Sequence, residues 1–399
     1  MERVVVTGIG IISAIGTDKE TFWENAVQGT NGINPIESFD TSDYPTNYGG
    51  EIKGFKPCVK NIDIQSIGKC SLYAASAARM AYEDAGITDD EGFKTNTEVF
   101  MGTTMGEGQE MGRIIRKRLS ESTVTSHELT RFPAHNISLA VCREFGIHRH
   151  PLLMSNACAA GNFAITAAYE RIRKGMTQYA FAGGAELFSE VAFKGFSKLR
   201  SVASRKCSPF DKNREGMILG EGAGVLLLES LESAKKRNAD IYAEVIGWGA
   251  SCDAYHMAAP SPDAHGITAA MRNALANADI SAENVDYICA HGTGTAANDK
   301  AEALAINEIF GRRLPVSSLK SMIGHAMGAA SAIEAAACCM TIKNSIILPT
   351  INFTEADEEC DIDCVPNASR RAEVRIAANN AYAFGGNNSC VLFSEVCDG

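Results

Sequence analysis

The sequence has no uninterrupted apolar run of 18 residues, and it is short of positive charge and of paired cysteines. Without such a run we expect no transmembrane helix, and because Met1 leads directly into a predicted strand we expect no signal peptide. The 37 lysines and arginines face 48 aspartates and glutamates, which gives a formal net charge of −11. That balance argues against nucleic acid or an anionic membrane as the main partner.

The 13 cysteines include no C-x-x-C pair and no spacing typical of metal ligands. We therefore expect neither a metal site nor a disulfide framework, and the pattern is typical of reduced thiols in the cytoplasm. A stretch near the N-terminus, Gly8-Ile9-Gly10-Ile11-Ile12-Ser13, superficially resembles a dinucleotide-binding loop. It lacks the third glycine of that loop and no helix is predicted to open there, so a bound dinucleotide is not expected.

What the sequence does contain is a regular alternation of short apolar strands and helices. The predicted strands are Arg3–Thr7, Glu98–Met101, Tyr179–Ala182, Tyr242–Ile246, Tyr287–Ala290, Pro315–Ser318, Arg375–Ala378 and Cys390–Glu395. The predicted helices are Lys69–Asp84, Ala164–Lys174, Ile267–Ala276, Asp299–Phe310 and Ala326–Ile342. Residues 28–66 are expected to form an irregular insertion and residues 107–137 a polar excursion. The alternation predicts an α/β fold with parallel sheets covered by helices.

The pattern restarts near residue 241, which indicates an internal repeat. Segment Cys158-Ala159-Ala160-Gly161 parallels His325-Ala326-Met327-Gly328, and each follows a strand and opens a helix. We therefore predict two similar βαβ halves, residues 1–240 and 241–399. This alignment places Cys158 and His325 in corresponding positions across a pseudo-twofold axis.

Cys158 lies where the apolar run Leu152-Leu153-Met154 ends and a helix follows. The backbone N–H groups and the dipole at the start of a helix favour an anion. The pKa of the Cys158 thiol is therefore expected to fall from about 8.5 toward neutrality, which would make it a nucleophile. The alternative is that Cys158 is a small core residue among alanines.

Four sequence-distant segments fall at the ends of predicted strands: Cys158, His291, His325 and the glycine turn after Phe384. A thiolate among them could attack a carbonyl and form a thioester. Backbone N–H groups of Cys158 and of the Phe384-Gly385 turn could hold the oxyanion. Two imidazoles that donate Nε2–H would suit a thioester carbonyl that becomes an enolate. That chemistry fits the decarboxylation of a malonyl thioester, which needs no metal.

The sequence resembles the elongating, synthase II-like β-ketoacyl-acyl-carrier-protein synthases of the thiolase-like superfamily over essentially its full length. The segments that carry the resemblance are residues 4–8, Ala157-Cys158-Ala159-Ala160-Gly161, 182–186, 209–211, 220–223, 253–257, His291-Gly292-Thr293-Gly294-Thr295, Asn298-Asp299, Lys320-Ser321, Gly324-His325 and 380–386. The resemblance implies a thiolase fold of two halves in five α-β-α-β-α layers. It also implies an acyltransferase that condenses an acyl group on Cys158 with a malonyl thioester in fatty-acid, polyene or polyketide-type synthesis.

The resemblance assigns roles to individual residues. Cys158 would be acylated by an acyl carrier protein, and His291 and His325 would bind the malonyl thioester carbonyl. Lys320 would hydrogen-bond around His325 and set the charge balance, with Glu334 as its buried ion-pair partner. No bound cofactor is implied, because 4′-phosphopantetheine arrives on the carrier protein. A homodimer is implied as well.

Further roles concern the substrate. Phe384 would gate the pocket and contribute its N–H to the oxyanion hole, and Asp299 would support the site. Thr293 and Thr295 would contact the pantetheine arm. Met105 is a candidate for the floor of the acyl pocket, although it could equally be a core residue.

The sequence also departs from the family pattern at Asn156, Asn387 and Ala296-Ala297, where threonine, threonine and proline are frequent. The segment near residues 60–70, which usually docks the carrier, has only the cations Lys60 and Lys69. A dedicated secondary pathway is therefore considered beside housekeeping fatty-acid synthesis. Docking of the carrier protein is expected instead at Arg205, Lys206, Lys198 and Arg200, with residues 116–118 as a weaker candidate.

Other classes fit the residues less well. A thiolase uses a second cysteine near the C-terminus, but Cys390 lies within a predicted strand. The three-carbon-starter synthases pair cysteine with His and Asn, which the segment from Lys320 to His325 does not match. A Cys-His hydrolase would leave the second histidine and Phe384 without a role. A non-catalytic chain-length partner usually lacks the nucleophile, but a role in a heterodimer with a homologous chain stays open.

Overall fold

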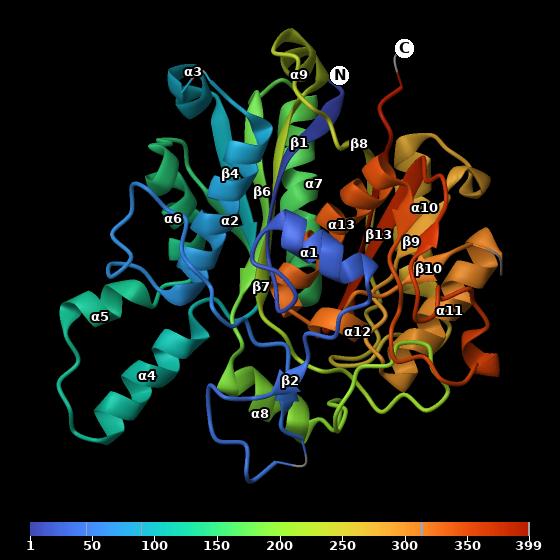
Figure 1. Ribbon diagram of the computed structural model, residues 1–399, viewed down its shortest axis with the longest axis horizontal. Coiled ribbons are helices and arrows are strands. Elements are labelled where there is room, and N and C mark those ends of the chain that lie inside the picture. The colour runs from blue at the N-terminus through green and yellow to red at the C-terminus, as the bar shows by residue number, and fades with distance from the viewer. Residues whose placement is uncertain (45, 89, 312–313, 398–399) are drawn as a thin grey trace.

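The computed structural model describes residues 1–399 except 45, 89, 312–313 and 398–399 (Figure 1). Ten strands of the described residues form one hydrogen-bonded sheet in the order β10-β9-β13-β14-β8-β1-β7-β6-β4-β5. Five of them come from the first half of the chain: β1 (Val4–Ile12), β4 (Thr97–Gly102), β5 (Leu152–Met154), β6 (Tyr179–Glu186) and β7 (Gly222–Ser230). The other five are β8 (Ala243–Cys252), β9 (Tyr287–Cys289), β10 (Val316–Ser317), β13 (Ile376–Ala383) and β14 (Asn387–Ser394).

Each set of five repeats one topology, with the third, second, fourth, fifth and first strand of the set side by side. Strand β4 runs parallel to β5 and β6, whereas β7 runs antiparallel to β6 and β1. The second set matches this, with β9 parallel to β10 and β13, and β14 antiparallel to β13 and β8. The internal repeat is confirmed, but the prediction of parallel sheets is wrong for the last strand of each half. Strands β13 and β14 are joined by a short turn, which forces an antiparallel pair.

The two sets meet where residues 4–6 of β1 pair antiparallel with residues 243–245 of β8. The hydrogen-bonded sheet is therefore continuous across the pseudo-twofold axis. The proposed boundary at residue 240 stays a prediction, because the two halves share one central core.

The helices divide into three layers around the two sets of strands (Figure 1). Helices α2 (Lys69–Ala85) and α6 (Asn136–Phe145) pack on the outer face of the first set. Helices α7 (Ala160–Arg173) and α13 (Ala330–Asn344) lie between the two sets. Helices α10 (His265–Ala278) and α11 (Ala296–Phe310) cover the outer face of the second set. The five-layered α-β-α-β-α arrangement is confirmed.

Shorter elements complete the described chain. The remaining helices are α1 (Lys19–Val27), α3 (Asp90–Thr95), α4 (Gly108–Leu119), α5 (Ser126–Arg131), α8 (Glu190–Lys198), α9 (Leu231–Lys236) and α12 (Lys320–Ile323), with 3₁₀ turns η1 (Ala157–Ala159), η2 (Ala282–Asn284), η3 (Met327–Ala329) and η4 (Glu358–Cys360). The remaining strands are β2 (Asn34–Pro35), β3 (Tyr48–Gly49), β11 (Ile346–Ile347) and β12 (Arg370–Arg371). Residues 28–66 are largely irregular as predicted, whereas residues 107–137 are mostly helical.

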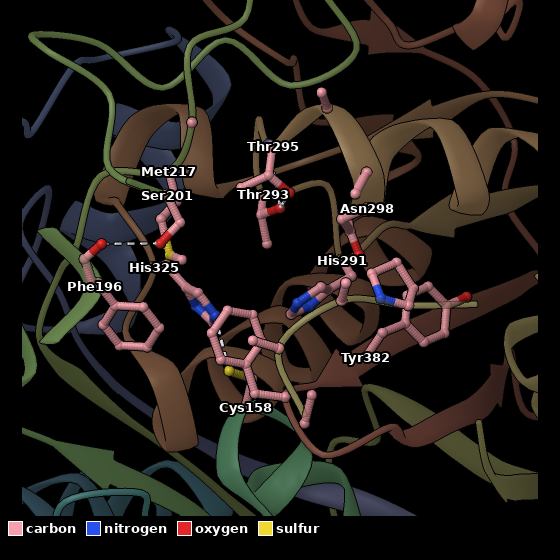
Figure 2. Close-up of a pocket in the computed structure, with 18 of the residues that line it drawn as sticks. Cys158, Phe196, Ser201, Met217, His291, Thr293, Thr295, Asn298, His325 and Tyr382 are labelled. Atoms are coloured by element: carbon pink, nitrogen blue, oxygen red, sulfur yellow. Dashed lines mark hydrogen bonds between the residues drawn. The ribbon is translucent and has the colours of Figure 1, made fainter. Parts of the chain in front are cut away.

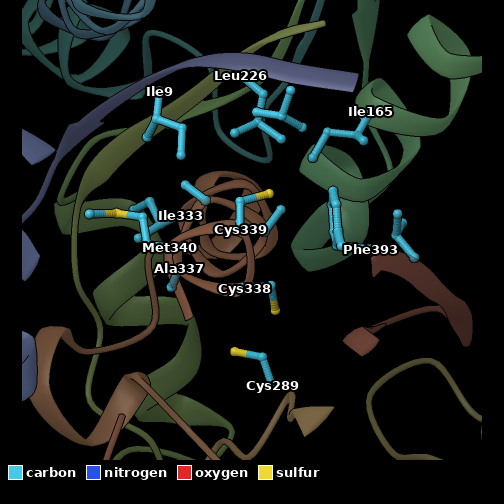
Figure 3. Close-up of a cluster of buried hydrophobic side chains, with 14 of the residues drawn as sticks. Ile9, Ile165, Leu226, Cys289, Ile333, Ala337, Cys338, Cys339, Met340 and Phe393 are labelled. Carbon is cyan, nitrogen blue, oxygen red and sulfur yellow. The ribbon is translucent and has the colours of Figure 1, made fainter. Parts of the chain in front are cut away.

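Helix α13 forms the centre of the core, and every residue from Ala330 to Ile342 is buried. Figure 3 shows it end on, with Ile9 and Leu226 from the first half and Phe393 from the second half around it. A helix that is surrounded in this way has no polar face, which explains its small apolar sequence. No helix in the described part of the chain is long and apolar enough to cross a membrane.

The glycine-rich stretch near the N-terminus is a strand, because β1 continues from Val4 to Ile12. A Cβ atom on Gly8 would lie 2.0 Å from the carbonyl oxygen of Ala81, and one on Gly10 would lie 1.9 Å from that of Ala77. Both carbonyls belong to α2, so the glycines permit close packing of a helix on the strand. The expectation that no dinucleotide loop opens here agrees with this geometry.

Candidate active site

Cys158 lies in the 3₁₀ turn η1, between the end of β5 and the start of α7, and is buried. The preceding residue, Ala157, has a φ of 48°, a left-handed conformation that costs about 1 kcal/mol for an L-residue. The predicted strand-to-helix junction is therefore present, and a strained backbone turns the thiol into a cavity (Figure 2).

The expected lowering of the thiol pKa is wrong. Burial raises the pKa of Cys158 to about 12, and the charge of Glu186 adds to the rise. The ammonium of Lys320 and the backbone N–H groups of Phe384 and Cys158 itself act in the opposite direction without offsetting the burial. In the resting structure Cys158 is therefore a neutral thiol, because loss of hydration outweighs the start of the helix.

His325 is the direct partner of the thiol, with its Nε2 3.1 Å from the Cys158 Sγ. The backbone N–H of Met327 donates to its Nδ1 at 3.2 Å. A neutral imidazole whose Nδ1 accepts a hydrogen bond carries its proton on Nε2. Burial and the nearby Lys320 charge hold the pKa of His325 well below its usual range, so the ring stays neutral and Nε2 points a donor at the site.

His291 faces the same cavity, and its ring centre is 5.3 Å from that of His325, with the ring planes at 84°. Burial, the charge of Lys320 and the neighbouring His325 lower its pKa well below the usual range. Its backbone is fixed by the buried carboxylate of Glu302, which accepts from the N–H groups of His291 and Gly292 at 2.9 and 2.8 Å. The structure thus brings two neutral imidazoles to one thiol.

Lys320 is fully buried and donates to the Glu334 Oε1 at 2.5 Å. Burial raises the pKa of Glu334 to about 7, and the Lys320 ammonium opposes this shift. Lys320 is therefore not an exposed lysine at the start of α12. Burial is the main cause of the low pKa values of both histidines, and the Lys320 charge lowers them further, so both rings stay neutral.

The thiol opens into a cavity of about 290 Å³. Its lining includes Cys158, Phe196, Arg200, Ser201, Arg214, Glu215, Met217, Asp253, Pro260, His291, Thr293, Thr295, Asn298, His325, Tyr382, Phe384 and Asn388. The hydroxyls of Thr293 and Thr295 lie 2.9 Å apart, away from the thiol in Figure 2. The ring of Phe384 packs 5.5 Å from that of Phe196, and its backbone N–H is directed at the Cys158 sulfur.

Two predicted site residues lie outside this lining. Met105 and Phe384 both pack against one apolar cluster that includes Met327, and Met105 does not line the cavity itself. Asp299 accepts from the N–H groups of Phe210 and Gly294 at 2.9 and 3.2 Å. It therefore holds the loop that carries the two threonines.

The four cations expected to dock a carrier protein, Lys198, Arg200, Arg205 and Lys206, are all exposed, and Arg200 lines the mouth of the cavity. None of them forms an ion pair with another described residue. In the weaker candidate, Arg116 is paired with Glu190 and Lys117 with Glu128. The first group is therefore the freer set of charges beside the cavity.

The predicted equivalence of Cys158 and His325 is wrong by three residues. The turn η1 before α7 corresponds to η3 before α13, and Met327 repeats the left-handed backbone of Ala157 with a φ of 43°. Cys158 therefore corresponds to Gly328. The alignment by sequence matched Cys158 to His325 because both have reactive side chains. The residue that truly corresponds to Cys158, Gly328, has no side chain.

Sequence reasoning missed the buried carboxylates that fix the site loops. Beside Glu302, Glu186 accepts from the N–H groups of Thr104, Met105 and Gly328 at 2.6, 3.0 and 3.2 Å. Nothing in the local sequence distinguishes such a residue from a surface glutamate. Within the described part of the chain no three histidine, cysteine or acidic residues are grouped so that they could hold a metal ion.

Two family sequence models match the chain: the N-terminal domain of beta-ketoacyl synthase over residues 1–234, and its C-terminal domain over residues 242–354. The chain belongs to the β-ketoacyl synthase family. It is 38% identical over 416 residues to 3-oxoacyl-[acyl-carrier-protein] synthase 2 of Coxiella burnetii, with 99% of each chain covered. It is a condensing enzyme of the acyltransferase class.

Solved structures of the family are similar along the whole chain. The ishigamide ketosynthase/chain length factor matches with a TM-score of 0.96 and 39% identity, covering 99% of this chain and 100% of that one. A second match is a type II polyketide synthase acyl-carrier protein in complex with its ketosynthase bound to a hexaketide. It has a TM-score of 0.92 and 31% identity, and covers 99% of this chain and 100% of that one.

Proposed function

We propose that the protein extends an acyl chain by two carbons through decarboxylative condensation with a malonyl thioester of an acyl carrier protein. The observation that carries this is the contact of 3.1 Å between the Cys158 Sγ and the His325 Nε2, with His291 on the same cavity. In the first step Cys158 attacks the donor thioester. The carrier thiol leaves with the proton of the Cys158 thiol, and an acyl thioester remains on the enzyme.

In the second step the bond between the malonyl carboxylate and its α-carbon breaks and CO₂ leaves. The electron pair moves onto the thioester oxygen as an enolate, held by Nε2–H donors of His291 and His325. The α-carbon then attacks the acyl group on Cys158, and the N–H groups of Cys158 and Phe384 hold the resulting oxyanion. The attack forms the new carbon–carbon bond. Collapse of the oxyanion then re-forms the carbonyl, breaks the bond between the acyl carbon and sulfur, and releases the Cys158 thiolate, which takes a proton from solvent. Lys320 and Glu334 keep the imidazoles neutral donors throughout.

The proposed substrates carry their own 4′-phosphopantetheine, so every bond change is made by side chains and backbone of this chain without a resident cofactor. Thr293 and Thr295 are assigned to the pantetheine arm, since they lie on the cavity away from the thiol. Lys198, Arg200, Arg205 and Lys206 are assigned to an acidic carrier protein. Their exposure beside the cavity, in a chain of net charge −11, supports this assignment.

We further propose a cytoplasmic dimer, either of two copies or with a homologous chain-length factor, and a polyketide or polyene pathway. The edge strand β5 supports a twofold partner, because an exposed strand edge readily pairs with another chain and Leu152 is 41% exposed there. The similarity to a ketosynthase/chain length factor supports the pathway and the second kind of partner. Met105, behind Phe384, is assigned to the end of the acyl pocket.

Intact-mass spectrometry tests the function directly. Wild type and Cys158→Ala are incubated with a panel of acyl-carrier-protein thioesters, followed by malonyl-carrier protein with detection of CO₂. A stable acyl adduct on wild type only, consumed when malonyl-carrier protein is added, is expected. If neither protein is acylated by any donor, condensation is excluded and a non-catalytic partner chain becomes the leading interpretation.

A further inference from the structure

Four buried polar side chains form a network behind the thiol: Asn162 on α7, Ser331 on α13, Asn379 on β13 and Ser389 on β14. None is more than 1% exposed. The mechanism proposed above uses none of them. Burying polar groups at the centre of an apolar core costs free energy unless the groups are hydrogen-bonded. The presence of this network therefore points to a role in the site.

The two asparagines bind each other reciprocally. The Nδ2 of Asn379 donates to the Oδ1 of Asn162 at 2.8 Å and to the carbonyl oxygen of Ser331 at 2.8 Å. The Nδ2 of Asn162 donates to the carbonyl oxygen of Asn379 and to the hydroxyl of Ser389, both at 3.2 Å. All four amide hydrogens are therefore used, which fixes the orientation of both side chains.

The network also caps the helix that follows the nucleophile. The backbone N–H of Asn162, in the first turn of α7, has no partner within its own helix and donates to the Ser331 hydroxyl at 3.0 Å. Because Ser331 lies in the first turn of α13, this bond ties the starts of two helices together. Cys158 lies just before the start of α7, and His325 lies just before the start of α13.

Three members of the network lie close in sequence to a residue of the site. Asn162 lies four residues after Cys158, Ser331 six residues after His325, and Asn379, on β13, five residues before Phe384, which directly follows that strand. Asn379 is also paired in register with the last residue of β9, two residues before His291. The network therefore connects the four segments that meet at the cavity.

We propose that Asn162 and Asn379 are positioning residues. They hold the turn that contains Cys158 at hydrogen-bond distance from His325 and beside the turn that contains Phe384. This rests on the function proposed above. Neither asparagine touches the reacting atoms; they act through the backbone of the elements they join. A displacement of about 1 Å between reacting groups lowers a rate by about 100-fold, so a rigid link at this point has kinetic value.

The test compares Asn162→Leu, Asn379→Leu and the double variant, since leucine has a similar shape and cannot form these bonds. Thr97→Val is the matched control, because it removes a buried hydrogen bond to the Phe93 carbonyl at the far end of β4. Each single variant is expected to slow acylation of Cys158 by about 10- to 100-fold, with KM for the donor within about twofold. The double variant should lose less than the two single effects combined, because each single change already removes the bond between the two asparagines and leaves the other asparagine without that partner.

A second readout does not depend on the acyl donor. The rate of Cys158 alkylation by iodoacetamide, followed by peptide mass spectrometry against pH, reports the surroundings of the thiol. Its pH midpoint should move upward in the asparagine variants and stay unchanged in Thr97→Val. Ser389→Ala, which removes only one peripheral acceptor, should fold and show a smaller shift in the same direction.

Acylation and alkylation profiles equal to wild type in variants that are only less stable would overturn the proposal, since the pair would then be purely structural. An inert wild type would instead count against the proposed function. The alkylation profile would still decide whether the asparagines position the thiol.

Discussion

The two turns η1 and η3 have the same shape and opposite uses. Both contain a left-handed residue, Ala157 or Met327, and open a central helix; η1 follows β5, whereas α12 lies between β10 and η3. In the first half the next residue is Cys158, whose own N–H faces its sulfur. In the second half the next residue is Gly328, whose N–H donates to Glu186. One turn presents a nucleophile, and its counterpart anchors the scaffold.

This difference shows how a duplicated fold builds one site from two halves. The first half supplies the thiol, and the second half supplies both imidazoles, the ion pair and the Phe384 gate. Gly328 is kept small because a Cβ there would lie 2.6 Å from backbone atoms of Thr103 and Thr104. The loss of a side chain in the second turn lets the first-half loop pack against it.

The largest effect is expected from the charge that only the second half contributes. Burial is the main cause of the low pKa values of His291 and His325, and Lys320→Met removes the cation that lowers them further. Those pKa values should rise, so the acid limb of the pH–rate profile should move to higher pH. Protonation of His325 at Nδ1 would break its bond from Met327, since both groups would then be donors. Condensation on the acid limb is expected to fall by up to about 100-fold, with a smaller loss at pH 7 because burial still favours the neutral rings.

The double variant Lys320→Met/Glu334→Gln is the control for stability. It should unfold at a higher denaturant concentration than Lys320→Met alone, because a single change leaves a buried carboxyl without its partner. If the acid limb of Lys320→Met stays where wild type has it, Lys320 does not set the charge of the histidines.

Much of this comparison could be predicted from the sequence. Apolar strands and helices alternate locally, so the elements, the repeat and the position of Cys158 at a strand end followed from pattern alone. His291 and His325 were identified because each occurs in a glycine-containing segment after a predicted strand. The periodicity of apolar residues and the glycine-containing turns are local features, so they can be identified without knowledge of the tertiary contacts.

The rest depends on contacts between distant residues. The pairing of Asn162 with Asn379 leaves no periodic trace in the sequence, and the buried Lys320–Glu334 pair is expected only from the family resemblance. The true partner of Cys158 in the repeat is a glycine, so a search for similar side chains aligned His325 instead. The sequence predicts the wrong direction for the thiol pKa, because the helix start is visible in the sequence and the burial around Cys158 is not.

A smaller effect should follow from filling the second turn. Gly328→Ala places a methyl group against the backbone of Thr103 and Thr104, which is itself held by Glu186. Overpacking of this kind costs about 1 to 3 kcal/mol, which urea denaturation would measure. Gly195→Ala is the matched control, because nothing lies within 4 Å of its Cβ position in α8. Equal stabilities of the two variants would mean that the close approach at Gly328 is relieved without cost.

The last effect concerns the pH dependence of stability that the anchoring carboxylate imposes, and it is spread over more than two pH units. Burial raises the pKa of Glu186 to about 7, against the opposing N–H donors, from an ordinary value of 4.5. Between these values the folded protein holds a proton that the unfolded chain has released, so stability falls as pH rises from 4.5 through 7. One such proton contributes at most about 1.4 kcal/mol per pH unit.

Glu186→Gln removes this titration. The unfolding free energy of wild type minus that of the variant, measured in urea from pH 4.5 to 8, should therefore decline up to about pH 7 and then level off. Glu302→Gln offers a parallel case in the second half, because burial also raises the pKa of Glu302 to about 7. A difference that grows with pH would show that the N–H donors hold Glu186 ionised. In that event the N–H of Gly328 would bind an ionised carboxylate. The turn η3 would then resemble an oxyanion-binding site that the side chain of Glu186 occupies.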